Sequence, residues 1–258
     1  MITSTSNVQV KYVIGLQTKA KMRREEGVYV IEGLRMFKET PKELIEKVYA
    51  GEEFFKEKEF LFSGCPKVEL VSEKVLKAMS DTKSPQGVIC IVKQKSYDLH
   101  TILGENEEPL LVILEDIQDP GNMGTIFRTA EAAGALGVIL SKNCVDIYNP
   151  KTIRATMGSI YRLPFFYAED LHEVLDDLEN IGIKSYGAHL LGETSYHCQD
   201  YKKGAAFVIG NEGNGLSEEI SKKISTLIKI PMQGQVESLN AAMACGILLY
   251  EAARQRLL

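Results

Sequence analysis

The 258-residue sequence lacks the marks of several protein classes. Its five cysteines are an odd number without a Cys-x-x-Cys pair, so neither a disulfide framework nor a zinc site is indicated. No apolar run reaches the roughly 18 residues of a membrane span, and no secretory signal opens the chain. We therefore expect a cytoplasmic protein that binds neither membrane nor metal, since metal-ligand spacing is also missing among the four histidines, His100, His172, His189 and His197.

A strong excess of basic charge is also missing, because the net charge is -5. The charge is uneven, however. Residues 1–100 hold 14 Lys and 3 Arg against 12 Glu and 2 Asp, a net of +3, which leaves a net of −8 for the remainder. This pattern fits a polyanion partner that meets mainly the front of the chain, although an ordinary solvated surface explains it equally well. The candidate contacts are Lys11, Lys19, Lys21, Arg23, Arg24 and Arg35.

Strand and helix patterns alternate from residue 109 onward. Short apolar, β-branched runs predict strands at 110–114, 137–140, 183–187, 205–209 and 226–230. Helical spacing predicts helices at 123–133, 171–180, 217–224 and 238–256. This alternation is typical of an α/β fold with a parallel sheet covered by helices.

The front of the chain has the pattern of a smaller α/β domain. We expect strands at 28–32 and 87–92 and helices at 41–48 and 72–79. The sequence becomes polar and irregular near the boundary. The predicted domains are therefore residues 1–98 and 109–258, joined by a linker at 99–108.

Three loops follow predicted strands, at the edge where parallel α/β sheets bind ligands. The first begins a helix at Asn122 and places Arg128 six residues later, which could equally be a helix cap and a surface arginine. In the third, Ser238 can cap the last helix, with Asn240 in its first turn facing the loop.

The second loop is rich in glycine, at Gly210, Gly213 and Gly215. Glycine lets a ligand approach the backbone closely. The spacing G-x-x-G-x-G fits neither the dinucleotide fingerprint nor the P-loop, so both of those phosphate sites are excluded. A simple turn before a helix capped by Ser217 is the alternative.

Taken together, the three loops are specific. The motifs N-x-G-x-x-x-R from Asn122, G-N-E-G-x-G-L from Gly210 and I-P-M-x-G-x-x-x-S-L-N from Ile230 resemble the SpoU, or TrmH-like, branch of the SPOUT methyltransferases. The resemblance covers about residues 109–256. Residues 1–98 are similar to the RNA-substrate-binding domain that often precedes it, notably at Ser84-Pro-Gln-Gly-Val-Ile-Cys.

The resemblance implies a deep trefoil knot near the C-terminus, a homodimer, and S-adenosylmethionine as cofactor for methylating a ribose 2′-hydroxyl in RNA. It places cofactor contacts at Gly210, Asn211, Ile230, Met232 and Leu239. It places the functional polar positions at Asn122, Arg128, Glu212, Ser238 and Asn240. Part of the last helix, which is apolar around much of its circumference, is expected to face a second subunit.

The chemistry constrains one of these roles. An arginine keeps its proton well beyond neutral pH, so we interpret Arg128 as a cation that positions the ribose or its phosphate and stabilises developing alkoxide. Glu212 would orient Arg128, and Asn122 would fix the geometry of its loop.

Other functions stay open at this point. The fused front domain favours ribosomal RNA over transfer RNA as substrate. An RNA-binding protein with an inactive cofactor site is possible but disfavoured by the intact polar positions, and a nicotinamide-dependent oxidoreductase is disfavoured by the glycine spacing. Since no cofactor loop precedes Leu114, a chain starting near Glu105 is expected to fold and to bind the cofactor without the front domain.

Overall fold

The structure, a computed structural model, describes residues 1–106 and 108–257. Glu107, in the expected linker, and Leu258, at the end of the expected second domain, lie outside the described residues. Contacts divide the chain into two compact units. The first unit is Met1–Lys95 with Asp146–Tyr161, and the second unit is Ser96–Val145 with Arg162–Leu258. No described helix is both long enough and apolar enough to cross a membrane.

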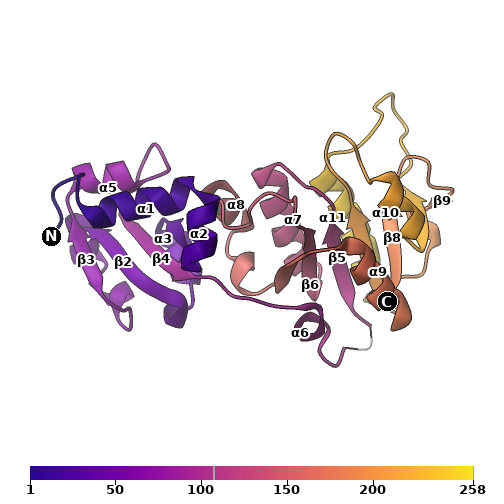
Figure 1. Cartoon of the computed structure of the whole chain (residues 1–258), viewed down its shortest axis with the longest axis horizontal. Helices are drawn as coiled ribbons and strands as arrows, with labels where there is room; N and C mark the ends of the chain where they lie inside the picture. The colour runs from indigo at the N-terminus through magenta and orange to yellow at the C-terminus, as the bar shows by residue number, and fades with distance from the viewer. Residues whose placement is uncertain (107, 258) are drawn as a thin grey trace. The chain divides into compact units, whose positions relative to one another are not determined.

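The first unit is built on a mixed four-stranded sheet of order β1-β4-β2-β3. Its strands are β1 (Val28–Glu32), β2 (Ile45–Gly51), β3 (Val68–Val71) and β4 (Val88–Lys93). Its helices are α1 (Val8–Thr18), α2 (Ala20–Glu26), α3 (Leu34–Glu39), α4 (Glu52–Glu57), α5 (Glu73–Met79) and α8 (Pro150–Thr156). Helices α1 and α5 cover one face of the sheet (Figure 1), where Val13 and Leu16 pack with Val75 and Met79 in a common core.

The helix expected at 41–48 is wrong. A short 3₁₀ turn, Lys42–Leu44, is followed directly by strand β2. Ile45 and Val48 are buried, and β2 pairs with β4 on one side and with β3 on the other. An apolar pair three residues apart fits one helical turn or a strand, and here pairing on both edges decides for the strand.

Residues 146–161 lie between two strands of the second unit in sequence but pack within the first unit. The rings of Tyr148 and Tyr29 lie 4.5 Å apart. The guanidinium of Arg23, which is 3% exposed, donates to the Asp146 carboxylate through Nη2 at 2.6 Å and Nε at 2.8 Å. The first unit is therefore completed by a segment that the sequence patterns assign to the second domain.

The second unit contains a seven-stranded sheet of order β7-β6-β5-β10-β8-β11-β9, in which every recorded pairing is parallel. Its strands are β5 (Leu110–Leu114), β6 (Gly137–Ser141), β7 (Phe165–Ala168), β8 (Lys184–Ala188), β9 (Thr194–Ser195), β10 (Ala205–Ile209) and β11 (Thr226–Lys229). Its helices are α6 (Leu99–Leu103), α7 (Pro120–Ala132), α9 (Leu171–Asn180), α10 (Glu218–Lys223) and α11 (Ala241–Arg256).

Helices cover both faces of this sheet. In β5, Leu111 and Ile113 belong to the core cluster that also contains the apolar side chains of α9 and α10. Helices α7 and α11 pack against each other, with α7 on β6 and α11 on β10. The parallel sheet covered by helices is confirmed, and edge strands β7 and β9 are additions to the predicted set.

The segment expected to be an irregular linker contains a helix. Asp98 caps α6 by accepting a hydrogen bond from the Thr101 N–H, and Ile102 is buried in the core of the second unit. The helix was not predicted because its few apolar residues are flanked by polar ones and give too short a helical pattern. The functional domain limits at 98 and 109 stay a prediction.

All ligand-site candidates predicted in the second half follow strands β5, β10 and β11. These strands are parallel and close in the sheet, so their following loops emerge at one edge. The loop after β8, the strand between β10 and β11, joins them there.

Candidate active site

The start of α7 differs from the simplest expectation. Asp119, rather than Asn122, is the N-cap: its Oδ1 accepts the backbone N–H of Asn122 at 2.8 Å, and Pro120 is the first helical residue. Proline suits that position because it has no N–H to lose. Asn122 therefore lies in the first turn, where its side chain is available for other contacts.

The start of α11 differs in the same way. Asn240, rather than Ser238, is the N-cap, and its Oδ1 accepts the backbone N–H groups of Ala242 at 3.0 Å and Met243 at 3.2 Å. Its Nδ2 donates to Oδ1 of Asn122 at 2.9 Å. One asparagine thus begins a helix and also joins the third loop to the first.

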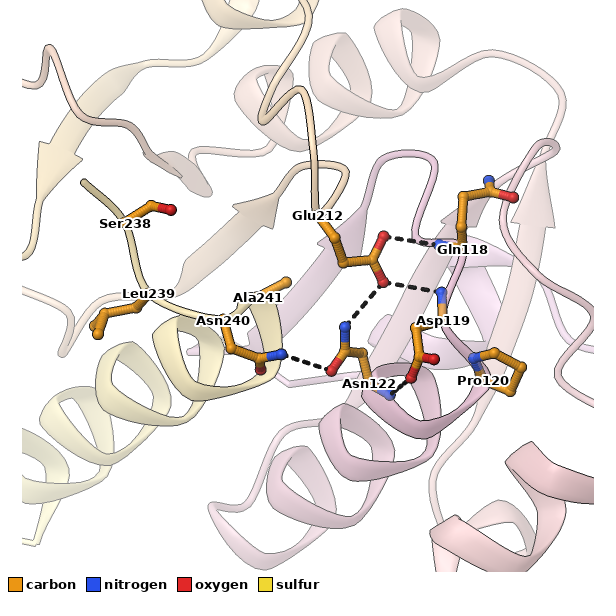
Figure 2. A pocket seen from close by; sticks show the side chains of 9 residues that line it. All are labelled: Gln118, Asp119, Pro120, Asn122, Glu212, Ser238, Leu239, Asn240 and Ala241. Atoms are coloured by element: carbon orange, nitrogen blue, oxygen red, sulfur yellow. Dashed lines mark hydrogen bonds between the residues drawn. The ribbon is translucent and has the colours of Figure 1, made fainter. Parts of the chain in front are cut away.

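The Glu212 carboxylate connects the second loop to the first (Figure 2). It accepts the backbone N–H groups of Gln118 at 3.0 Å and Asp119 at 2.9 Å, and the Asn122 Nδ2 at 3.0 Å. Partial desolvation opposes ionisation, but the three hydrogen bonds outweigh it and hold the pKa of Glu212 below its ordinary value. The carboxylate thus keeps its charge at neutral pH, and its hydrogen-bonded form is lost only as pH falls through that lowered pKa.

Hydrogen bonds thus join the side chains of Glu212, Asn122 and Asn240 in a row, called here the Glu212–Asn122–Asn240 chain. Two adjoining cavities lie beside it. The first has a volume of about 540 Å³ and is lined by six polar and three apolar residues: Gln118, Asp119, Pro120, Asn122, Glu212, Ser238, Leu239, Asn240 and Ala241. Glu212 and Ser238 also line the second cavity. Four of the five predicted polar positions therefore come together at one place.

The second cavity has a volume of about 760 Å³, within the usual range for small-molecule sites. It is formed by the loops after β8, β10 and β11 and the start of α11. All five predicted cofactor contacts line it: Gly210, Asn211, Ile230, Met232 and Leu239. A Cβ added to Gly210 would lie 2.2 Å from the carbonyl carbon of Gly215, so only glycine allows this close turn of the loop.

Arg128 stands apart from the other polar positions. It is exposed, lines neither cavity, and has no hydrogen bond or ion pair with any described residue. Six residues along an α-helix turn it by about 240° relative to Asn122, so the two point to different sides of α7. Within the single chain, the described hydrogen bonds of Glu212 hold the 118–122 segment and none reaches Arg128, so the expected orientation of Arg128 by Glu212 stays a prediction.

The six basic side chains predicted to contact RNA fall into two groups. Lys11, Lys19, Lys21, Arg24 and Arg35 are exposed. Arg23 is buried, and besides Asp146 it donates to the carbonyl oxygens of Leu16 and Gln17. Arg23 is therefore not available to a polyanion at the surface, which corrects its inclusion among the candidate contacts.

Two groups at the site were missed in the sequence: the backbone N–H groups of Gln118 and Asp119. Asp-Pro is a helix-start signal, and applying it would have made Asp119 the cap and left Asn122 for other contacts. The bonds of these N–H groups to Glu212 have no sequence signal, because they join residues more than 90 positions apart.

The chain matches known families over both parts. Residues 109–250 match the SpoU rRNA Methylase family, and residues 7–90 match the MRM3-like substrate binding domain. The chain therefore belongs to the SpoU rRNA methylase family, with an MRM3-like substrate-binding domain in front, and the resemblance seen in the sequence is confirmed.

Individual relatives match along nearly their whole length. The chain is 31% identical to the 23S rRNA (guanosine(2553)-2′-O)-methyltransferase RlmP of Bacillus subtilis, over 96% of this chain and 97% of the relative. The SpoU methyltransferase AviRb of Streptomyces viridochromogenes, solved with AdoMet, is 28% identical with a TM-score of 0.88, covering 97% of this chain and 98% of that one. An AdoMet-bound rRNA methyltransferase of Sinorhizobium meliloti is 32% identical with a TM-score of 0.87, covering 98% and 97%.

Proposed function

We propose that this protein methylates a ribose 2′-hydroxyl in ribosomal RNA, with S-adenosylmethionine as the methyl donor. One observation carries the proposal: the Glu212–Asn122–Asn240 chain joins three loops at the boundary between a polar cavity and a larger cavity lined by the glycine loop. Two adjoining cavities with shared walls are what transfer between two bound molecules requires. Family membership and the rRNA-methylating relatives support the same activity.

The larger cavity fits the cofactor by its chemistry. Backbone groups at Gly210 and Asn211 can bind the polar edge of an adenosine and the amino-acid part, while Ile230, Met232 and Leu239 offer apolar contact. When bound, S-adenosylmethionine supplies an activated methyl group on a sulfonium. The AdoMet-bound structures of two relatives support this assignment.

The smaller cavity would hold the target nucleotide. Methyl transfer needs the hydroxyl aligned in line with the methyl group and helped to lose its proton. Asn122 and Asn240 are fixed by hydrogen bonds to each other and to Glu212, so they can orient a ribose without reorganising. Ser238, on the shared wall, adds a hydroxyl that can accept or donate a hydrogen bond there.

Calorimetric titration with S-adenosylmethionine and with NAD tests the proposal first. Binding of S-adenosylmethionine alone supports methyl transfer, binding of NAD alone would support an oxidoreductase, and binding of neither would support an RNA-binding protein with an inactive cofactor site. Digestion and mass mapping of ribosomal and transfer RNA from a knockout strain then identify the nucleotide that loses its 2′-O-methyl group. Loss from transfer RNA alone would contradict the choice of ribosomal RNA.

We also propose the finer properties that the resemblance implies: the trefoil knot in the second unit, and a cytoplasmic location where ribosomal RNA is the substrate. A chain closed into a knot would keep its topology on partial unfolding. Refolding from denaturant more slowly than a parallel α/β unit of this size would support the knot.

We propose that the five predicted basic contacts that are exposed bind the RNA. They are Lys11, Lys19, Lys21, Arg24 and Arg35. Replacing all five with glutamine should weaken RNA binding and lower the slope of log affinity against log salt by about 0.7 to 0.9 for each phosphate that the variant no longer neutralises. An unchanged slope would show that these residues form only a solvated surface.

We propose a homodimer formed through α11. Met243 and Tyr250, two turns apart on α11, are 60% and 55% exposed in the single chain, a poor environment for an apolar stripe. Gly246 faces α7 instead, because an added Cβ would lie 3.5 Å from Thr129 Cγ2. Gly246 therefore allows close packing within the chain, whereas Met243 and Tyr250 are available to contact a second subunit.

Replacing both Met243 and Tyr250 with glutamate should convert the dimer to a monomer. Burying carboxylates without a partner in an interface is strongly unfavourable. Sedimentation at micromolar concentration measures the change. Phe60→Glu, at a side chain 75% exposed in the first unit, is the matched control and should leave the dimer intact. A monomeric wild-type protein would contradict the proposal.

Glu212→Gln should lower the rate of methyl transfer about 100-fold, a typical loss when a reacting group is misplaced by about 1 Å. Both carboxylate oxygens accept N–H groups, so one of them would meet an amide NH₂ and the 118–122 segment would shift. Single-turnover rates measure this effect. Glu219→Gln, at an exposed position of α10, is the control and should have no effect. A near-wild-type rate for Glu212→Gln would show that the hydrogen-bonded chain does not position the reaction.

A further inference from the structure

Asp116 has an unusual backbone conformation next to the proposed site. Among the described residues, only Asp116 and Met157 combine a side chain with positive φ, and φ of Asp116 is 56°. Aspartate adopts the left-handed region more readily than most residues but still at a cost. Asp116 follows the carboxyl end of β5, and such strained positions are often retained where the surrounding contacts require them.

The side chain of Asp116 is held from the end of β6 and the loop that follows it. The Ser141 hydroxyl donates to Oδ1 of Asp116 at 2.6 Å and accepts the Asp116 backbone N–H at 2.9 Å, so one buried hydroxyl fixes both groups. Asn143 Nδ2 donates to the other carboxylate oxygen at 3.3 Å. These hydrogen bonds compensate for the strained backbone.

The carbonyl of Asp116 faces the glycine loop. It accepts Asn211 Nδ2 at 2.8 Å, and Oδ1 of that same Asn211 accepts the N–H groups of Gly213 at 2.9 Å and Asn214 at 3.1 Å. Asn211 thereby shapes the loop that lines the larger cavity. Gln118 Nε2 also donates to the Asp116 carbonyl, at 3.1 Å.

The residues just after Asp116 serve the other cavity. The backbone N–H groups of Gln118 and Asp119 bind Glu212, at the wall that both cavities share. The left-handed turn at Asp116 thus separates a carbonyl that holds the glycine loop from N–H groups that hold Glu212. Asp116 itself lines neither cavity.

We propose that Asp116 is a positioning residue for methyl transfer: its left-handed turn, held by Ser141 and Asn143, sets the glycine loop in register with the Glu212–Asn122–Asn240 chain. This inference rests on the proposed function. It assigns to Ser141 at the end of β6 and Asn143 in the next loop, which line neither cavity, the task of fixing the distance between cofactor and substrate.

Five variants of the full chain test the proposal, four of them by turnover. Asp116→Asn keeps a residue suited to positive φ and an acceptor for Ser141, so its turnover should stay within about threefold of wild type. Asp116→Gly keeps the turn but removes the hydrogen bond from the Ser141 hydroxyl to the carboxylate. Ser141→Ala removes the same bond by deleting its donor. Each variant should lower kcat about tenfold and leave KM for RNA within about twofold. Both variants remove the bond from the Ser141 hydroxyl to the carboxylate, while Ser141→Ala also removes the acceptor of the Asp116 N–H and Asp116→Gly the acceptor of Asn143. Because the largest lost interaction is shared, the decrease in the double variant should fall well short of 100-fold.

Three results would overturn the proposal: wild-type kcat in Asp116→Gly, additive decreases in the double variant, or a rate that falls only in proportion to the folded fraction in thermal melts. Calorimetry with S-adenosylmethionine gives a readout independent of turnover. Asp116→Ala, which strains the turn and also removes the carboxylate, should weaken this binding about tenfold. If the wild-type protein binds S-adenosylmethionine but methylates no RNA, the proposed function fails, while this binding comparison still decides the role of Asp116.

Discussion

Arg128→Ala should reduce methyl transfer below detection while leaving the affinity for S-adenosylmethionine within about twofold, because the side chain is exposed and lies outside both cavities. It is held by no described residue, so its guanidinium is available to a phosphate or to a developing alkoxide, where a fixed positive charge stabilises the transition state. Arg128→Lys keeps the charge but not the two-pronged geometry, and an intermediate decrease is expected. Calorimetry and methyl-transfer rates measure the two effects separately.

The control for Arg128→Ala is Lys184→Ala, at an exposed position where β8 begins, on the edge of the sheet opposite the cavities. It should leave the rate unchanged. Near-wild-type turnover of Arg128→Ala would end the proposed catalytic role, and loss of cofactor binding would make Arg128 a binding residue instead.

Arg128 and Asn122 face different sides of α7, so Arg128 can act in one of two ways. Either bound RNA reaches it from the site of the same subunit, or it acts in the site of a second subunit. Mixing Arg128→Ala with Asn240→Ala distinguishes the two. In randomly mixed dimers, half are mixed and each has one intact composite site, so about a quarter of the wild-type rate should return if Arg128 acts across the dimer. No recovery would place Arg128 and Asn240 of the same chain in one site.

The sequence predicted the second unit better than the first, for a physical reason. Strands such as β5 and β10 are buried on both faces, so each is a continuous apolar run between turn signals. Strand β2 has an exposed Glu46 beside Ile45, and its identity depends on pairing with β4, which is distant in sequence. Local patterns therefore favoured a helix there.

At the site, residue identity was predictable but hydrogen-bonding roles were not. Asn122, Glu212 and Asn240 could be named from their motifs, yet two neighbouring residues competed for each helix cap. Only the structure shows that Asp119 caps α7, which leaves the Asn122 amide to bridge Glu212 and Asn240. Asp116 gave no signal at all, because its conformation depends on Ser141, 25 positions away.

The segment 146–161 changes what a shortened chain should do. Tyr148 and Tyr161 are each 8% exposed. Their partners include Tyr29, whose ring lies 4.5 Å from that of Tyr148, and Thr40, which donates to the Tyr161 hydroxyl at 2.7 Å. Both of those partners precede residue 96. Removing them would expose the aromatic surfaces of Tyr148 and Tyr161 that these partners cover.

A chain beginning at Glu105 should therefore be poorly soluble and should not melt cooperatively, contrary to the expectation from the strand–helix alternation alone. Co-expression with residues 1–98 should restore a soluble complex, because the first unit can then form around residues 146–161. Arg23→Ala in the shorter fragment should weaken this recovery, since it leaves Asp146 without its partner, a loss of about 3 kcal/mol for a buried pair. Arg24→Ala, at the exposed neighbouring position, should not weaken the recovery.

Soluble yield, thermal melts and calorimetry with S-adenosylmethionine measure each combination. A 105–258 fragment that melts cooperatively and binds the cofactor by itself would show that residues 146–161 fold without the first unit.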